Sequence, residues 1–128
     1  MMINSIGTWN WVLYDKYNSG QYTGINFYAN NYSGSSPLLT STVTTTANIW
    51  QYVTITRKGS TFTLYINGVS VSTETFAGAI DTGTPNGFQI GMGSAAAYVM
   101  KRYIEDFQFT KGLCKYSANF TPPIAEII

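Results

Sequence analysis

The dipeptide Asn67-Gly68 constrains the fold of this chain more than any other feature of its sequence. Both central residues of a type I′ turn need a positive φ, and Asn followed by Gly adopts that geometry readily. Apolar and polar residues alternate on both sides of the dipeptide, so the pattern predicts a β-hairpin with one apolar and one polar face. The two-residue loop pairs Ile66 with Val69 and Leu64 with Val71.

The rest of the chain also consists of short strand-like segments separated by turns. Residues 49–57 alternate, with Val53 and Ile55 on the apolar face, and a turn follows at residues 58–60. Residues 15–20, 30–37 and 78–87 have the composition of turns and loops. Further strands are expected over residues 8–14, 22–29, 40–46, 88–92 and 102–110. The segment 40–46 reads either as an edge strand or as a low-complexity stretch, and the last strand carries an expected β-bulge near Asp106.

This arrangement predicts an all-β fold. About eight or nine short strands, with turns every 8 to 12 residues, are typical of an antiparallel β-sandwich or jelly roll. No segment keeps a helical apolar period, so no long helix is expected. The chain has 128 residues, which fits a single domain over residues 1–128. The expected core comprises Val53, Ile55, Leu64, Ile66 and Val71.

Composition excludes several classes of function. Seven Lys and Arg against six Asp and Glu give a net charge of +1, so nucleic acid is not an expected partner. Histidine is absent and Cys114 is the single cysteine, which excludes Ser-His-Asp and Cys-His catalysis, His-ligated metals and an internal disulfide. No run of about 18 apolar residues occurs, so membrane insertion is not expected. The first residues also lack the pattern of a signal peptide.

Two blocks of sequence resemble a known family. Residues 50–57 (WQYVTITR), followed by residues 64–69 (LYINGV), resemble the core of concanavalin A-like lectin/glucanase domains, and specifically the laminin-G-like jelly roll. Residues 103–112 and 116–123 resemble the closing block of the same domains, which is frequent in phage tail and other virion proteins. The resemblance spans the core motif region, residues 49–123.

The resemblance implies a concanavalin A-like antiparallel β-sandwich, and a domain trimmed at its N-terminal edge is one reading of the residues before it. The family usually has one or two extra strands before the region that matches residues 9–14, whereas only about seven residues precede Thr8 here. Three readings stay open: a trimmed domain, the end of a longer chain, or an edge that a partner chain supplies. An uncovered edge strand favours assembly, so a homo-oligomer is expected.

Catalysis and metal binding have little support in the sequence. The glucanase branch carries paired carboxylates in an E-x-D-x-x-E strand, and none of Glu74, Glu105 and Glu126 begins that pattern. We therefore expect a protein that is not an enzyme and needs no cofactor. Calcium is the one alternative, with Asp81 and Asp106 as candidate ligands; ordinary turn-forming side chains are the competing reading.

Aromatic side chains offer a third kind of chemistry. Pyranose C–H faces pack on flat rings, and Tyr and Trp combine an apolar body with a polar tip. The chain has 10 Tyr and 3 Trp, and the carbohydrate-binding candidates are Trp9, Trp11, Tyr52 and Tyr65. The same rings are equally compatible with a second core or a subunit interface.

Two functions follow from these observations and the resemblance. The first is a non-enzymatic bacteriophage virion component, on a tail fibre or the capsid surface, that binds host-surface glycans and contacts other virion proteins. The second is a purely structural decoration or fibre protein that uses the same faces for subunit or capsid contacts.

Overall fold

The computed structural model describes residues 2–5, 11–19, 21–29, 37–46, 48–80, 88–90 and 103–124. All regular elements in this part of the chain are strands, and every pairing is antiparallel. The all-β prediction is therefore confirmed.

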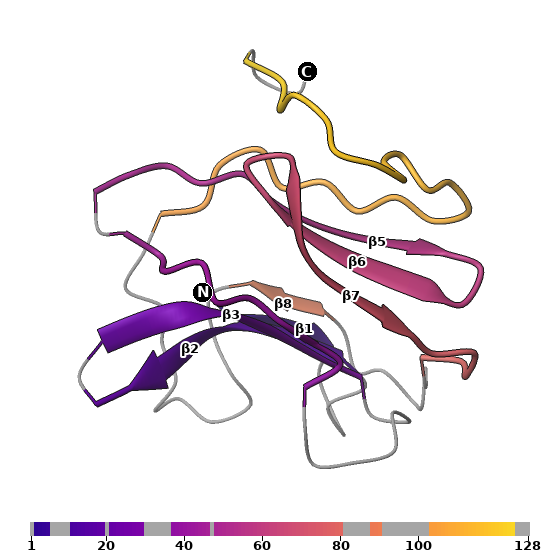
Figure 1. Ribbon diagram of the computed structural model, residues 1–128, viewed down its shortest axis with the longest axis horizontal. Helices are drawn as coiled ribbons and strands as arrows, with labels where there is room; N and C mark the ends of the chain where they lie inside the picture. Colours follow the sequence, from indigo (N-terminus) through magenta and orange to yellow (C-terminus); the bar gives the residue numbers. More distant parts are fainter. Residues whose placement is uncertain are drawn as a thin grey trace.

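The described residues form eight strands in two stacked sheets (Figure 1). The first sheet has five strands in the order β4-β3-β2-β1-β8, and the second has three in the order β5-β6-β7. The first sheet comprises β1 (Met2–Ser5), β2 (Trp11–Asn18), β3 (Gln21–Ala29), β4 (Leu39–Thr40) and β8 (Phe88–Ile90). The second comprises β5 (Val53–Lys58), β6 (Thr61–Ile66) and β7 (Val69–Thr75).

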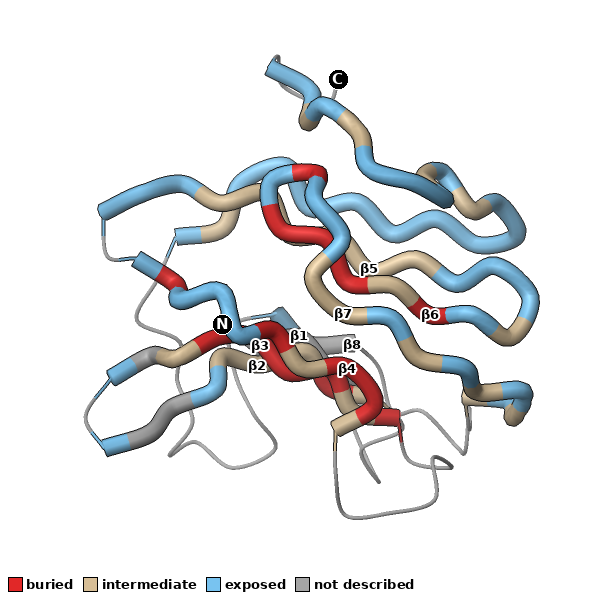
Figure 2. Tube along the Cα trace, in the orientation of Figure 1, coloured by how far each residue is buried: buried red, intermediate tan, exposed pale blue. Residues whose placement is uncertain are grey.

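The core lies between the sheets, where buried segments of both face each other (Figure 2). Phe27 of β3 and Phe62 of β6 join the two layers, with ring centroids 6.2 Å apart. Fully burying a side chain of this size stabilises the fold by about 1.5–3 kcal/mol. The five predicted core residues all belong to this cluster: Leu64 and Ile66 are buried, and Val53, Ile55 and Val71 pack against it.

Strand β1 is the main element that the sequence did not predict. It pairs with β2 on one side and with β8 on the other. Residues 2–5 thus supply a strand before the region 9–14, and this strand lies between β2 and β8 in the first sheet. Four residues are too short a run for an alternating pattern to be recognised.

The hairpin at Asn67-Gly68 forms with the predicted turn but with a different register. Asn67 and Gly68 have φ values of 51° and 79°, and Ile66 pairs with Val69. A bulge between Leu64 and Tyr65 then pairs Leu64 with Ser72, so the predicted Leu64–Val71 pair is wrong. The bulge has a physical reason, because it places the Ser72 hydroxyl where it accepts a hydrogen bond from the Thr40 backbone N–H of β4, at 3.3 Å.

Some predicted boundaries are also wrong. Residues 103–110 form no regular strand, and Asp106 has a φ of 53°, which interrupts an extended backbone at the point where a bulge was expected. Of the segment 40–46, which could be either an edge strand or a low-complexity stretch, only Thr40 lies in a strand, β4. Strand β2 continues to Asn18, through most of the expected turn. Residue 102 and the first residues of the predicted strand 8–14 lie outside the described part of the chain.

Candidate functional site

A wide groove runs along the free edge of β5, and we call it the β5 groove. Its walls are the loop before β5, the inner face of β2 and β3, and the C-terminal segment 103–116. Residues 103–115 of this segment run beside β5 (the orange stretch in Figure 1). Because β5 pairs only with β6 among the described strands, its other side is open to the groove.

Three rings on the groove walls are strongly exposed. Trp50 is 65% exposed, Tyr103 is 91% exposed and Phe109 is 68% exposed. Scattered apolar residues are normal on a protein surface, but several large rings along one groove are typical of a binding site. Polar side chains lie among them, at Asn48, Gln51 and Thr54.

A chain of ring contacts ties the groove to the core. Phe109 stacks on Trp11 with centroids 6.5 Å apart and an interplanar angle of 17°. Trp11 in turn lies 6.3 Å from Phe27, which contacts Phe62. Aromatic pairs of this kind contribute about 0.5–1.5 kcal/mol beyond their buried area. The floor of the groove is therefore fixed on the packed interior of the sandwich.

The end of the chain closes the outer face of β5 and β6, and we call residues 116–122 the C-terminal clasp. The Phe120 N–H donates to the Gly68 carbonyl at 2.9 Å, and the Ser70 N–H donates to Asn119 Oδ1 at 2.9 Å. Phe120 stacks on Tyr116, with centroids 3.5 Å apart. The clasp thus attaches to the hairpin turn through backbone and side-chain hydrogen bonds together.

This clasp overturns one sequence-based candidate. Tyr65 is one of the predicted carbohydrate-binding residues, but it is only 2% exposed because the Phe120 ring packs edge-on against it at 5.4 Å. A buried ring cannot offer its face to a sugar. The competing reading of a second core holds for this residue.

Tyr52 lies at the boundary between the clasp and the groove. Its backbone is tied to the hairpin turn, since its N–H donates to Asn67 Oδ1 and its carbonyl accepts from the Asn67 N–H, both at 2.8 Å. Burial raises the pKa of the Tyr52 hydroxyl, and the hydrogen bond with Tyr116 raises it further. Tyr52 also lines the groove, so it remains a candidate contact residue.

The remaining candidates fall into two groups. Trp11 and Asp106 line the groove, Trp11 half-buried in its floor and Asp106 exposed on the C-terminal segment. Trp9 and Asp81 lie outside the described residues. Within the described ranges, no three His, Cys, Asp or Glu side chains come together in a way that could hold a metal ion.

Sequence reasoning missed Trp50, Tyr103 and Phe109 as site residues. The sequence places Trp50 in the predicted strand 49–57 and the family core motif, and it places Tyr103 and Phe109 in the predicted strand 102–110. Their grouping depends on how the C-terminal segment lies beside β5, which no local pattern encodes. A density of rings near residue 50 and near residue 105 was the one available signal.

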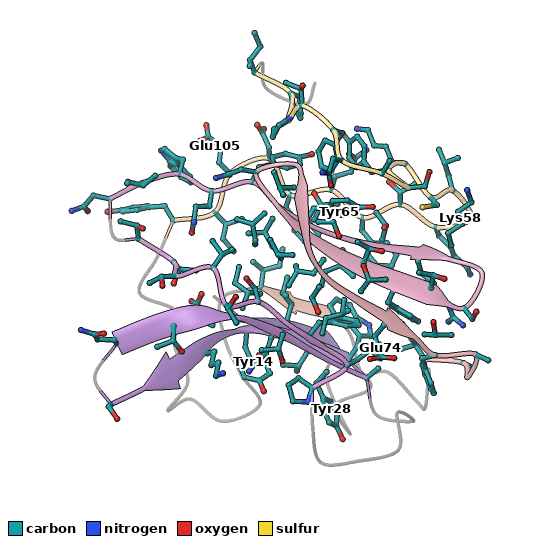
Figure 3. The ribbon with its side chains drawn as sticks, in the orientation of Figure 1. Tyr14, Tyr28, Lys58, Tyr65, Glu74 and Glu105 are labelled. Atoms are coloured by element: carbon teal, nitrogen blue, oxygen red, sulfur yellow. The ribbon has the colours of Figure 1, made fainter. Side chains whose placement is uncertain are left out.

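Charged side chains divide along the groove. Glu105 and Lys58 lie toward opposite ends of it (Figure 3). Asp106 belongs to the Glu105 end, where its charge acts on Tyr52. Arg57 makes intramolecular contacts. Its guanidinium donates to the Gly59 and Gly78 carbonyls, both at 2.9 Å, and it lies 4.8 Å from the Phe62 ring centroid.

Comparison with known proteins identifies the family. The model of the concanavalin A-like lectin/glucanases superfamily matches residues 3–112, which is well over half of the chain. The chain therefore belongs to this superfamily, and the two stacked sheets fit its jelly-roll fold. No curated protein and no solved structure matches it. In the described ranges, no helix has the length and apolar character needed to cross a membrane.

Proposed function

We propose that this chain is a non-enzymatic carbohydrate-binding domain on the exterior of a bacteriophage particle, in a tail fibre or on the capsid surface, where it binds host-surface glycans. The observation that carries the carbohydrate part is the β5 groove, in which the exposed rings of Trp50 and Tyr103 lie among amide and hydroxyl side chains. Rings of this kind pack against the apolar face of a pyranose, and the polar groups hydrogen-bond its hydroxyls. Membership of a lectin/glucanase superfamily supports this reading.

Contact without bond cleavage fits the carboxylates of the groove. Retaining hydrolysis needs two carboxyl groups about 5–5.5 Å apart, across the scissile bond. Glu105 and Asp106 are consecutive and exposed on one wall, and Glu74 lies on β7, where its carboxylate accepts the Thr75 N–H at 2.9 Å. We therefore propose a protein without catalytic residues and without a cofactor; Asp106 is the one described calcium candidate.

The virion setting rests on the closing sequence block. Residues 116–123 (YSANFTPP) resemble the ending that is frequent in phage tail and other virion proteins, and the C-terminal clasp is built from these residues. Other virion proteins and further copies of the chain are the proposed partners.

The test is a glycan array probed with the wild-type chain and two single variants. Trp50→Ala removes an exposed ring from the groove, whereas Tyr28→Ala removes a ring that points away from β5–β7, below the first sheet (Figure 3). We expect Trp50→Ala to weaken binding of the best saccharide about 5- to 160-fold, in line with the loss of an aromatic contact of about 1–3 kcal/mol. Tyr28→Ala keeps wild-type affinity. Equal affinities for all three chains would refute the groove as the binding site.

A structural role is the second candidate, and one observation favours it. Several large apolar side chains on the groove rim are exposed, namely Ile49, Leu113 and Ile124 in addition to the rings. Apolar surface of this extent is also typical of subunit interfaces. Light scattering and the glycan array together separate the two roles. A stable assembly in which the rim is protected, and which binds no saccharide, would favour the structural role.

A further inference from the structure

Resting on the proposed function, we propose that the saccharide is anionic: two lysines on the walls of the β5 groove, Lys58 and Lys111, bind a carboxylate, sulfate or phosphate group carried by the sugar chain. Both lysines line the groove. Lys58 is the last residue of β5, and Lys111 lies on the C-terminal segment that forms the facing wall.

The groove separates its charges over a useful length. The acidic side chains Glu105 and Asp106 lie at the end near Tyr52, and Lys58 lies toward the far end of β5 (Figure 3). The five steps from Val53 to Lys58 along β5 span about 17 Å at the rise of an extended strand. That distance exceeds the Debye length of about 8 Å at physiological salt, so the two ends act on a ligand almost independently.

The neighbouring cations are already engaged, which singles out the two lysines. Arg57 is bound to two carbonyls and the Phe62 ring, as described above. The Lys115 ammonium donates to Gln108 Oε1 at 3.3 Å and lies 5.5 Å from the Tyr116 ring centroid. In the described part of the chain, neither Lys58 nor Lys111 has a carboxylate within ion-pairing distance or another hydrogen-bond partner for its ammonium group. Both lysines therefore line the groove without a carboxylate partner among the described residues.

The anionic group adds selectivity to the contacts that the rings provide. Trp50 and Tyr103 offer flat faces that do not distinguish neutral from charged sugars. Lys58 and Lys111 add charge-assisted hydrogen bonds at a fixed distance along the chain of the saccharide. The acidic end disfavours a second anion beside Tyr52, so the charge also sets the direction in which the saccharide lies.

The experiment compares matched saccharide pairs that differ only in their charged group. The pairs are a sialylated oligosaccharide and its desialylated form, a sulfated and a desulfated polysaccharide, and a phosphorylated glycan and its dephosphorylated form. The chains are the wild type, the double variant Lys58→Gln/Lys111→Gln, and the control Lys16→Gln, which removes an exposed lysine of β2 outside the groove. Binding is measured by titration at low and at physiological salt.

We expect the wild type to bind at least one anionic member about tenfold more tightly than its neutral partner, because an exposed ion pair contributes a factor of up to about five for each lysine. The double variant loses this preference and Lys16→Gln keeps it. The pair that shows the preference identifies the anionic group. Equal binding of charged and neutral partners, or a preference that survives in the double variant, would overturn the inference while leaving the proposed function standing. Binding of no saccharide at all would defeat both.

Discussion

Replacing Gly68 by alanine tests the contact between the C-terminal clasp and the hairpin turn. Gly68 has a φ of 79°, and a Cβ there would collide with the backbone carbonyl of Phe120 and contact the Pro122 ring. An L-residue in the left-handed region costs about 1–2 kcal/mol, and forcing extra atoms into a packed contact costs about 1–3 kcal/mol. Gly68→Ala is therefore expected to lower the free energy of unfolding by about 2–5 kcal/mol.

Gly59→Ala is the matched control. Gly59 also has a positive φ, of 61°, but an added Cβ would meet no atom within 4 Å. It should cost only the conformational part, about 1–2 kcal/mol. Urea unfolding of the two variants and the wild type gives both differences from the shift in midpoint. If the two substitutions cost the same, the clasp does not press on the turn, and the argument that it buries Tyr65 fails.

Two further perturbations test the surroundings of the groove. Burial and the Tyr116 hydrogen bond raise the pKa of Tyr52 above 10.0 in the folded chain. As the pH rises, Tyr52 therefore ionises in the unfolded chain before it ionises in the folded chain. Its contribution to stability is complete below about pH 10 and is lost as the pH rises through the folded-state pKa. Stability measured from about pH 9 to 11 should therefore fall less steeply for Tyr52→Phe than for the wild type or the exposed control Tyr103→Phe, and identical slopes would contradict the assignment. Arg57→Lys loses the forked hydrogen bonds and the contact with the Phe62 ring, so it should cost about 1–2 kcal/mol in thermal or urea unfolding. Lys58→Gln should change stability by less than about 0.5 kcal/mol, and equal effects of the two would show that the Arg57 contacts contribute nothing.

The hairpin shows what local sequence could predict. Asn67-Gly68 supplies positive φ values through its own chemistry, and the residues that alternate around it set which face is apolar. The core pair of Val53 and Ile55 followed from the same rule. The bulge after Leu64 did not, because it depends on Ser72 reaching Thr40 in the other sheet.

The candidate site was less accessible to sequence reasoning. Tyr65 alternates like a surface residue on β6, and only the arrival of Phe120 from the far end of the chain buries it. Trp50 and Tyr103 lie far apart in the sequence, and the path of the C-terminal segment places both on one groove. Tertiary contacts between distant segments decide which rings are buried, and a local sequence pattern contains no information on these contacts.

The clasp also has a consequence for the groove. Phe120 packs against Tyr52 and Tyr65, whereas the exposed rings of Trp50 and Tyr103 line the β5 groove. Among the described residues, this favours the groove over that sheet face as the proposed saccharide site.

The most direct test of that site is an NMR titration of the chain with the saccharide that binds best on the array. Resonances of Trp50, Tyr103 and Phe109 should shift together as the groove fills, while those of Tyr14 and Tyr28, on the far side of the first sheet, stay in place. Shifts confined to Tyr14 and Tyr28, or no shift in the groove at saturating saccharide, would contradict the account.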